Sequence, residues 1–281
     1  MNRIDRIKLD FTRNWKLPGK ERLTHLLSPS RDLKASIKNG IAWLTGEDIA
    51  IYTSADSYIE WSILTTGTYE NEINKLIRIS LKAGETALDI GGNIGLQSLR
   101  MSQCVGNEGK VIAVEPLGYL QEKFRRNMAL NKAENITLLP YALSDEEGEV
   151  EFTIDSSSWN QGTFSLNKNA PGAEKQVVLI KIPDSVPEVS NLEAVHLIKI
   201  DVEGFEFQVL RGLKQTIERH KPRIIFEYDK GYWDNTGQAI AGCFLFLQQM
   251  NYTLYQITPV GCILLADSTM VESGNLFCMP S

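Results

Sequence analysis

Apolar, strand-like runs alternate with helical stretches from residue 85 onward, and this alternation constrains the fold of the chain more than any other feature. The helical stretches carry apolar residues three or four positions apart, whereas the strand-like runs are short and continuous, as buried strands are. A βαβαβ order makes neighbouring strands parallel and puts helices on both faces of the sheet. The pattern therefore predicts an α/β fold with a mostly parallel, doubly wound sheet, whose strands fall at 86–90, 111–114, 136–139, 195–200 and 224–226.

The two ends of the chain depart from this alternation. Near the start, runs at 41–45 and 49–53 flank a cluster of turn-forming residues and predict a hairpin. We expect residues 1–60 to form a small N-terminal helix and hairpin appendage, and residues 61–281 to form the main domain. At the other end, β-leaning runs without helices between them predict an antiparallel C-terminal edge of the sheet, at 252–257, 262–265 and 276–279.

The composition is that of an ordinary globular protein, with 43% hydrophobic and 23% charged residues. The longest near-continuous apolar run, Ala239–Leu247, is far shorter than the roughly 20 residues that span a bilayer. Charged residues interrupt the N-terminus, so no secretory signal is expected. We therefore expect a cytoplasmic protein without a transmembrane segment.

The formal net charge of -6 is unevenly distributed, because residues 1–40 carry ten Lys/Arg and four Asp/Glu while the rest carries 19 and 31. An acidic main domain argues against a nucleic-acid partner, since phosphate binding needs positive charge over the contact surface. The basic segment is either solvated or contacts an anionic partner, such as a membrane surface at its periphery. Nothing indicates the oligomeric state. The four cysteines and three histidines have no metal-ligand spacing, so no metal site is expected.

The segment most informative about chemistry is the turn where a strand ends in Asp89 and a helix follows. Its glycines allow a tight turn and a close approach of a ligand to backbone N–H groups. Read from Gly91, the dinucleotide fingerprint G-x-G-x-x-G needs two further glycines where the chain has Asn93 and Leu96. An acid beside the turn repels a pyrophosphate and suits a ligand with an amine and a sulfonium. The D-x-G-x-N-x-G pattern, which ends at Gly95, therefore points to S-adenosylmethionine, although such a turn can also be purely structural.

Further acids follow the predicted strands. Glu115 lies 20 residues after the glycine turn, where an acid can accept hydrogen bonds from ribose hydroxyls. Asp201 and Glu227 close two later strands, and Glu203 follows in the turn after Asp201. Because ligands bind beyond the carboxyl ends of parallel strands, these acids should share one crevice. Glu206 is expected to be exposed in the first turn of the next helix.

Together these motifs resemble the FkbM family of S-adenosylmethionine-dependent methyltransferases over roughly residues 60–265. The combination is specific, mainly because an Asp-Val-Glu-Gly segment occurs together with an Asn in the glycine turn. The resemblance implies a Rossmann-like class I methyltransferase fold and O-methylation of a hydroxyl on a sugar, a glycolipid or a polyketide-type natural product. It rests on the segments 67–70, 88–95, 114–116 with Asn127 and Asn131 downstream, 142–145, 160–165, 198–204 and 225–227.

The resemblance also implies roles for single residues. Those expected from it to hold the cofactor are Glu70, Asp89, Gly91 and Asn93 around the methionine part and the turn, Glu115 at the ribose, and Ala142 beside the adenine. From their places in the glycine turn and in the shared crevice, Gly95 and Asp201 are also expected to contact the cofactor. Those expected at the acceptor are Asn160, Thr163 and Ser165 in a polar loop, with Trp159 as a candidate ring for stacking on a sugar.

Methyl transfer requires alignment of the acceptor oxygen and exclusion of water, and an alcohol must lose its proton near the transition state. Asp201 is the expected general base, with Glu203 and Glu227 as rivals, and strand alternation places Lys199 on the same sheet face as Asp201. These carboxylates also suit magnesium, which is not favoured because a cationic cofactor already explains the acids. Two readings of other classes stay open: a catalytically silent S-adenosylmethionine-binding scaffold domain and, less favoured, a nucleotide-dependent oxidoreductase or epimerase.

Overall fold

The structure is a computed structural model, and it describes residue 11 and residues 40–54, 57–154 and 174–281. Its central sheet has the order β12-β11-β13-β10-β9-β3-β4-β5. In this order, β10, β9, β3, β4 and β5 run parallel to one another. On the other side, β13 pairs antiparallel with both β10 and β11. The predicted parallel α/β sheet with an antiparallel C-terminal edge is therefore confirmed. The strands are β3 (Thr86–Ile90), β4 (Lys110–Val114), β5 (Ile136–Leu139), β9 (Leu197–Ile200), β10 (Arg223–Tyr228), β11 (Tyr252–Thr258), β12 (Gly261–Leu264) and β13 (Gly274–Pro280).

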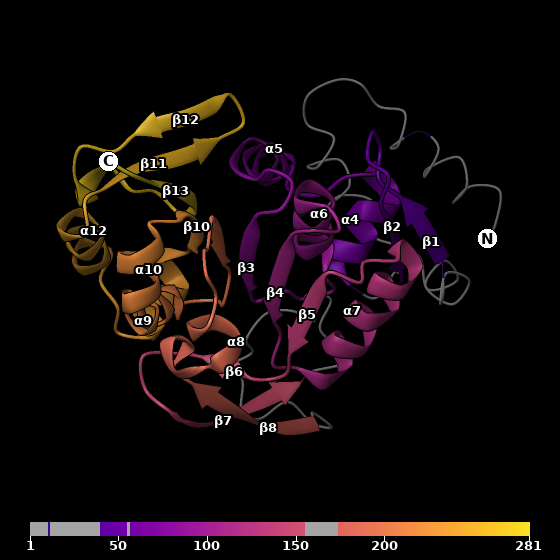
Figure 1. Cartoon of the computed structure of the whole chain (residues 1–281), viewed down its shortest axis with the longest axis horizontal. Coiled ribbons are helices and arrows are strands. Elements are labelled where there is room, and N and C mark those ends of the chain that lie inside the picture. The colour runs from indigo at the N-terminus through magenta and orange to yellow at the C-terminus, as the bar shows by residue number, and fades with distance from the viewer. Residues whose placement is uncertain (1–10, 12–39, 55–56, 155–173) are drawn as a thin grey trace.

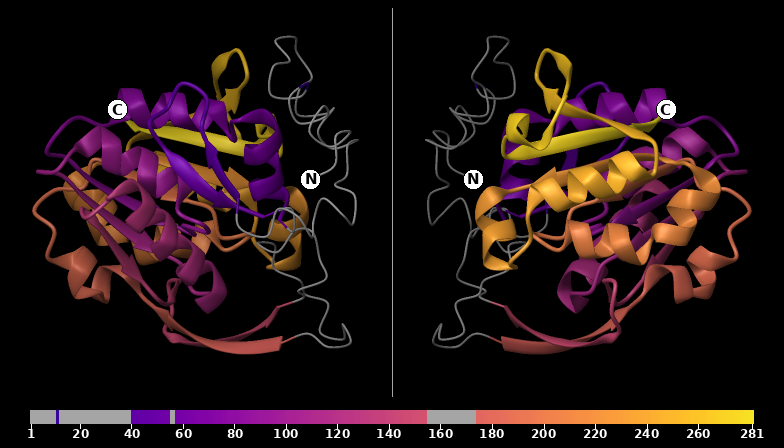
Figure 2. Two further views of the ribbon diagram at one scale, coloured as in Figure 1. Left: turned by 90° about the vertical axis from the view of Figure 1, so that its right-hand side faces the viewer. Right: turned by 90° about the vertical axis from the view of Figure 1, so that its left-hand side faces the viewer.

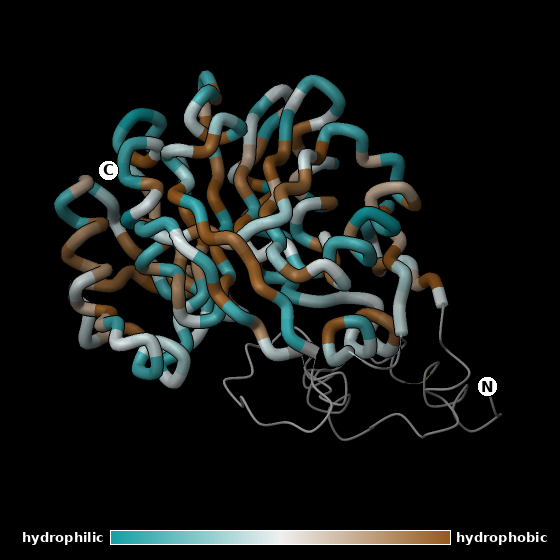
Figure 3. Tube along the Cα trace, turned by 90° about the horizontal axis from the view of Figure 1, so that it is seen from below, coloured by the Kyte–Doolittle hydropathy of each residue, from teal (hydrophilic) through white to brown (hydrophobic). Residues whose placement is uncertain are grey.

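Helices cover both faces of this sheet (Figure 1). Successive strand residues point to opposite faces, so Leu88 packs in one hydrophobic cluster and Ala87 in the other. The first face carries α9 (Glu206–Gly212), α10 (Lys214–His220) and α12 (Ile240–Gln249). The second face carries α5 (Asn71–Ser80), α6 (Leu96–Val105) and α7 (Gly118–Asn131). Figure 3 shows the resulting hydrophobic stretches along the inner strands, with polar residues on the surrounding turns.

A second, three-stranded sheet has the order β6-β8-β7. Its strands are β6 (Ala142–Leu143), β7 (Gly148–Ile154) and β8 (Glu174–Lys181), and the last two contain the runs that interrupt the βα alternation in the sequence. They lie along the lower edge of the molecule in both side views (Figure 2). The short elements η1 (Pro183–Ser185) and α8 (Pro187–Ser190) then lead back to the central sheet.

The predicted N-terminal hairpin is formed by β1 (Gly40–Trp43) and β2 (Ala50–Thr53), which pair antiparallel. Two amides of α7 hold it: Asn131 Oδ1 accepts from Ala50 N and Asn127 Oδ1 accepts from Tyr52 N, each at 2.9 Å. The inward-facing apolar residues of the hairpin region, Ala42, Leu44, Ile49 and Ile51, also belong to the hydrophobic cluster of α5, α6 and α7, whereas Ile41 and Trp43 are exposed. The division of the chain at residue 60 stays a prediction, and α4 (Tyr58–Thr66) spans it.

Two further elements complete the described chain, α11 (Lys230–Asn235) after β10 and η2 (Ser268–Met270) before β13. Within the described ranges, no helix combines the length and the hydrophobicity that crossing a bilayer requires.

Candidate active site

A cavity of about 400 Å³ lies at the carboxyl ends of the central strands. Its walls come from the glycine turn after β3, from the residues that end β4, β9 and β10, and from the β6-β8-β7 sheet. The strands β3 and β9 are neighbours, while the chain continues from β3 toward β4 on one side and from β9 toward β10 on the other. This is the topological switch point, where α/β sheets open the crevice that holds their ligands.

Close packing within the protein explains two of the glycines in the turn. Gly91 has φ 86°, and a Cβ at this position would lie 1.9 Å from the Asp201 carbonyl oxygen. Gly95 has φ 91°, and a Cβ there would lie 2.3 Å from the ring of Phe124. Larger residues at these positions would push β9 or α7 away from the turn. Gly91 therefore sets the close approach of the turn to the end of β9, and Gly95 sets its close approach to α7.

The backbone N–H groups of the turn face the protein. Gly91 N and Gly92 N both donate to Val114 O at 2.9 Å, and Asn93 N, at φ 50°, donates to Glu115 Oε2 at 2.9 Å. The expectation that the glycines expose their N–H groups to a ligand is therefore wrong for Gly91 and Gly92, and the N–H group of Asn93 is also occupied. The N–H groups of Gly91, Gly92 and Asn93 therefore do not bind a ligand at this turn.

Glu115 lines the cavity at the end of β4 and is 4% exposed. Its other oxygen, Oε1, accepts from Leu117 N at 2.9 Å. Burial raises the pKa of this carboxyl to about 8, although the two backbone N–H groups oppose the rise. Each carboxylate oxygen can accept a second hydrogen bond, so Glu115 retains the capacity to accept from a pair of hydroxyls.

Asp89 presents an unused hydrogen-bond acceptor in the cavity wall. The residue is completely buried, and its Oδ2 accepts from Ser98 Oγ at 2.5 Å. Its Oδ1 has no hydrogen-bond partner among the described residues. Burial raises the pKa of the carboxyl, and the nearby Lys199 opposes that rise. A buried acceptor without a partner is costly, so this oxygen favours a ligand with a cationic or N–H donor.

Lys199 stands beside Asp89 on the neighbouring strand, and its side chain is 3% exposed. Its Nζ lies 2.8 Å from Asp201 Oδ2, so the Lys-Asp contact anticipated from strand alternation is present. Burial alone would lower the pKa of Lys199, but Asp201, Asp89 and Glu70 raise it above its usual range. Lys199 therefore remains a cation inside the site.

Four carboxylates surround this one ammonium group, and we call Glu70, Asp89, Asp201 and Glu227 the carboxylate cluster. Burial, followed by repulsion from Asp201, raises the pKa of Glu227 to about 9. Burial likewise raises the pKa of Glu70, whose Oε2 accepts from Gln97 Nε2 at 2.7 Å. When fully ionised, these four carboxylates outnumber Lys199, so a bound cation would stabilise their ionised forms.

The segment after β9 folds back on itself. Glu203 and Gly204 have φ values of 54° and 100°, and a Cβ on Gly204 would lie 2.8 Å from Tyr232 O. Glu203 lines the cavity, and with burial it raises the pKa of Tyr232 to about 12.

Glu206 is buried, which contradicts the expectation that it is exposed. It is 1% exposed, and its carboxylate accepts from Val202 N, Gly204 N and Trp233 Nε1. The backward turn at Gly204 explains the difference, because it directs the first residue of α9 into the loop rather than toward solvent. Burial raises the pKa of Glu206 to about 7, against these hydrogen bonds.

The remaining predicted residues divide into those that the structure describes and those that it does not. Ala142 lines the cavity from β6, beside Leu143 and Ser144. The proposed acceptor residues Trp159, Asn160, Thr163 and Ser165 lie outside the described residues. Throughout the described ranges, no group of three or more His, Cys, Asp or Glu side chains is placed to hold a metal ion.

Sequence reasoning missed two kinds of residue. Gln97 and Ser98 contact Glu70 and Asp89, and their position in the first turn after the glycine motif was the signal that could have found them. The aromatic wall comes from separate segments that no local pattern connects. The aromatic residues that line the cavity are Tyr58, Tyr69, Tyr119, Tyr141, Phe152, Phe205 and Tyr232.

The residues present fit S-adenosylmethionine. The carboxylate cluster matches its sulfonium and ammonium charges, the free Oδ1 of Asp89 matches an N–H donor, and Glu115 has acceptors left for ribose hydroxyls.

Comparisons with known proteins find methyltransferases among those similar to this chain. The chain is 32% identical over 143 residues to "Methyltransferase 1" of Beauveria bassiana (strain ARSEF 2860), covering 45% of this chain and 57% of that protein. It is 28% identical over 166 residues to "2-O-methyltransferase NoeI" of Sinorhizobium fredii (strain NBRC 101917 / NGR234), covering 54% and 66%. The matches thus span less than two thirds of each relative's length. In structure it is similar to the methyltransferase FkbM from Methylobacillus flagellatus KT, with TM-score 0.43 and 15% identity over 79% of this chain and 53% of that one.

The match to a protein family is more extensive. The model of the Methyltransferase FkbM domain matches residues 89–254, which is more than half of the chain and runs from Asp89 to β11. The chain therefore belongs to the FkbM family of S-adenosylmethionine-dependent methyltransferases.

Proposed function

We propose that this protein transfers a methyl group from S-adenosylmethionine to a hydroxyl oxygen of a sugar, a glycolipid or a polyketide-type natural product. One observation carries the proposal: four carboxylates face a single ammonium group in a cavity at the topological switch point, and one of their oxygens has no partner among the described residues. Such a site stabilises a ligand with more positive than negative charge. Bound S-adenosylmethionine supplies an electrophilic methyl group on a sulfonium.

The cavity walls suggest how the cofactor is oriented. Glu70 and Asp89 receive the methionyl ammonium, and Glu115 accepts from the ribose hydroxyls. Ala142 borders the adenine. Gly91, Asn93 and Gly95 shape the turn without offering hydrogen bonds from Gly91 N or Asn93 N, which are already used.

Asp201 is the proposed general base. Lys199 holds its Oδ2 at 2.8 Å, which fixes the orientation of the carboxylate, while 30% of the Asp201 side chain is still exposed. Glu227 has a pKa of about 9 and is protonated at neutral pH until a cation binds, and Glu203 interacts with Tyr232. A positioned carboxylate within reach of the acceptor hydroxyl is what the reaction needs. Glu203 and Glu227 are the rival bases.

The acceptor side of the cavity is aromatic and acidic. Tyr58, Tyr69, Phe205 and Tyr232 offer rings and Glu203 offers hydrogen-bond acceptors, a combination suited to a hydroxylated ligand with apolar ring faces. The name of one relative, 2-O-methyltransferase, supports oxygen as the acceptor atom. The loop residues Trp159, Asn160, Thr163 and Ser165 remain proposed contacts of the acceptor. The proposal includes no nucleic-acid partner and no required magnesium.

Turnover of labelled S-adenosylmethionine tests the proposal. Saccharide, glycolipid and polyketide-type acceptors are incubated with the wild type and with Asp89→Ala, and mass spectrometry maps the methyl group on each product. We expect O-methylation of at least one class by the wild type and loss of that product with Asp89→Ala. Binding of the cofactor without transfer to any hydroxyl would instead support a silent binding domain. Transfer that persists with added chelator and stops without a hydroxyl acceptor supports the metal-independent mechanism.

A further inference from the structure

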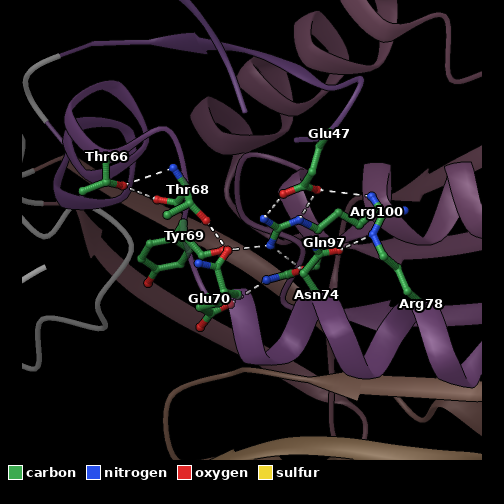
Figure 4. A network of polar contacts seen from close by, with 10 residues as sticks. Glu47, Thr66, Thr68, Tyr69, Glu70, Asn74, Arg78, Gln97 and Arg100 are labelled. Carbon is green, nitrogen blue, oxygen red and sulfur yellow. Dashed lines mark hydrogen bonds and ion pairs between the residues drawn. The ribbon is translucent and has the colours of Figure 1, made fainter. Parts of the chain in front are cut away.

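A buried ion pair joins the N-terminal hairpin to the helix that follows the glycine turn (Figure 4). Glu47, in the turn between β1 and β2, accepts Arg100 Nε at 2.9 Å on one carboxylate oxygen and Arg100 Nη2 at 2.7 Å on the other. The Arg100 side chain is fully buried, and that of Glu47 is 5% exposed. This bidentate contact fixes the plane of the guanidinium group.

Arg100 also contacts two residues of the cavity wall. Its remaining nitrogen, Nη1, donates to Tyr69 O at 2.8 Å and to Gln97 Oε1 at 3.3 Å. Gln97 in turn donates from Nε2 to Glu70 Oε2 at 2.7 Å. An amide has one accepting end and one donating end, so the contact with Arg100 determines that the donating end faces Glu70. Within this network, Tyr69, Glu70 and Gln97 line the cavity, whereas Glu47 and Arg100 do not.

The N-terminal hairpin also holds the backbone near Glu70. Glu70 adopts a left-handed conformation with φ 49°, which is uncommon for a residue with a Cβ and persists only where neighbours hold it. Gly67 precedes Glu70 by three residues, and its carbonyl oxygen accepts a hydrogen bond of 2.7 Å from Thr45 N in the hairpin. The hairpin therefore supports both the backbone and the side chain of Glu70.

We propose that Glu47 is a positioning residue for cofactor binding: through Arg100 and Gln97 it orients the Glu70 carboxylate toward the methionyl ammonium of S-adenosylmethionine. This rests on the proposed function, because it takes Glu70 as a partner of that ammonium. Glu47 lies outside residues 89–254, which the family model matches. The affinity for the amino-acid part of the cofactor thus depends on a hairpin that this match does not include.

Two ligands separate positioning from general damage. S-adenosylhomocysteine carries the ammonium that Glu70 would contact, and 5′-methylthioadenosine carries the adenosine and the sulfur without any amino-acid part. By calorimetry, Glu47→Gln should bind S-adenosylhomocysteine about tenfold more weakly, the loss expected for a misplaced charge-assisted hydrogen bond. Its affinity for 5′-methylthioadenosine should be unchanged. Asp48→Asn is the matched control, because it removes the same charge from an exposed neighbour in the same turn and should leave both affinities unchanged.

A double-mutant cycle tests whether Glu47 acts through Gln97. Gln97→Met keeps a side chain of similar length but can no longer donate to Glu70, and it should show the same ligand selectivity as Glu47→Gln. If both act on Glu70 in series, the double variant binds S-adenosylhomocysteine no more weakly than Gln97→Met alone. Additive losses, or equal weakening of both ligands by Glu47→Gln, would overturn the proposal.

Thermal unfolding accompanies each titration, because removing one partner of a buried ion pair is often destabilising. Should Glu47→Gln fail to fold, Arg100→Lys gives the same test, since it keeps a cation against Glu47 but cannot also reach Tyr69 and Gln97. An unchanged ratio of the two affinities in that variant overturns the proposal. If the wild type binds neither ligand, the proposed function fails; if the wild type binds S-adenosylhomocysteine and Glu47→Gln binds it equally well, only the role of Glu47 fails.

Discussion

Trp233 Nε1 donates a 2.7 Å hydrogen bond to Glu206 Oε2, although the two residues lie 27 positions apart on α11 and α9. The same carboxylate accepts from Val202 N and Gly204 N, on either side of the proposed site residue Glu203. Trp233 is 1% exposed and packs against Phe207, Phe226 and Tyr228. The indole thus connects the hydrophobic core to the loop that carries Asp201 and Glu203.

Trp233→Phe should therefore reduce both stability and turnover. It keeps an aromatic ring in the core but leaves a buried carboxylate without one donor, and we expect a loss of about 2 kcal/mol in the free energy of unfolding. Denaturant unfolding measures this loss.

Trp61→Phe is the matched control for that variant. Trp61 is 3% exposed, and its Nε1 has no hydrogen-bond partner among the described residues. The change removes a similar volume without removing a hydrogen bond, so it should cost clearly less. Equal losses in the two variants would mean that the Glu206 contact contributes nothing measurable.

The stability of the ligand-free protein should fall as pH rises. The pKa values of Glu206, Glu115 and Glu227 are raised from the ordinary 4.5 to about 7, 8 and 9. The folded state therefore holds more protons than the unfolded state between about 4.5 and 9. These raised pKa values do not reduce the free energy of unfolding below that window. As pH rises through the window, the free energy of unfolding falls, because the carboxyls ionise more readily in the unfolded state than in the folded state. Melting temperatures measured across the window should decline.

Glu227→Gln should flatten this decline at its alkaline end, because the neutral amide no longer ionises in the buried cluster. Glu147→Gln, at an exposed position, serves as the control and should follow the wild type. A Glu227→Gln profile with the wild-type slope up to pH 9 would show that Glu227 ionises without cost.

Binding of the cofactor should release protons. A bound ammonium or sulfonium stabilises the ionised forms of Asp89 and Glu227, whose pKa values burial raises in the ligand-free site. The affinity for S-adenosylmethionine should therefore increase between about pH 6 and pH 8. Titrations in buffers with different enthalpies of ionisation count the protons, and Glu227→Gln should release fewer. Proton uptake by the wild type would contradict the proposed charge state.

The assignment of the general base has a kinetic test. Asp201→Asn should reduce kcat by about a hundredfold or more, the usual contribution of a positioned base, with a smaller effect on cofactor affinity. The parallel variants Glu203→Gln and Glu227→Gln should retain more of the wild-type kcat. If Asp201→Asn has the wild-type kcat, the base is whichever of Glu203 and Glu227 gives the larger loss of kcat when changed to Gln.

The sequence predicts those features that local periodicity and motif spacing determine. Strands such as β3 and β4 are short apolar runs between amphipathic helices, and the acids Asp89 and Glu115 follow them directly, so their place at one edge of the sheet follows from the parallel order. Glu206 could not be placed in this way. Its burial depends on the backward turn at Gly204 and on Trp233, a contact over 27 residues that no short pattern contains.

The contacts of the hairpin could not be predicted from the sequence either. Glu47 meets Arg100 over 53 residues, and Asn131 meets Ala50 over 81. The Asn residues after β4 were recognised as part of the family pattern, but only the packing of the hairpin on α7 gives the physical reason for them. The tyrosines of the cavity wall could not be predicted from the sequence either, because they converge from separate segments.

Calorimetric titration with S-adenosylhomocysteine tests the central claim most directly. The wild type, Asp89→Ala and Glu115→Ala are each titrated, and NAD is titrated into the wild type for comparison. The carboxylate cluster and the Glu115 acceptors predict saturable binding of S-adenosylhomocysteine by the wild type, binding at least about tenfold weaker in each variant, and no binding of NAD. Absence of binding by the wild type, or undiminished binding by both variants, would contradict the assignment of this cavity as the cofactor site.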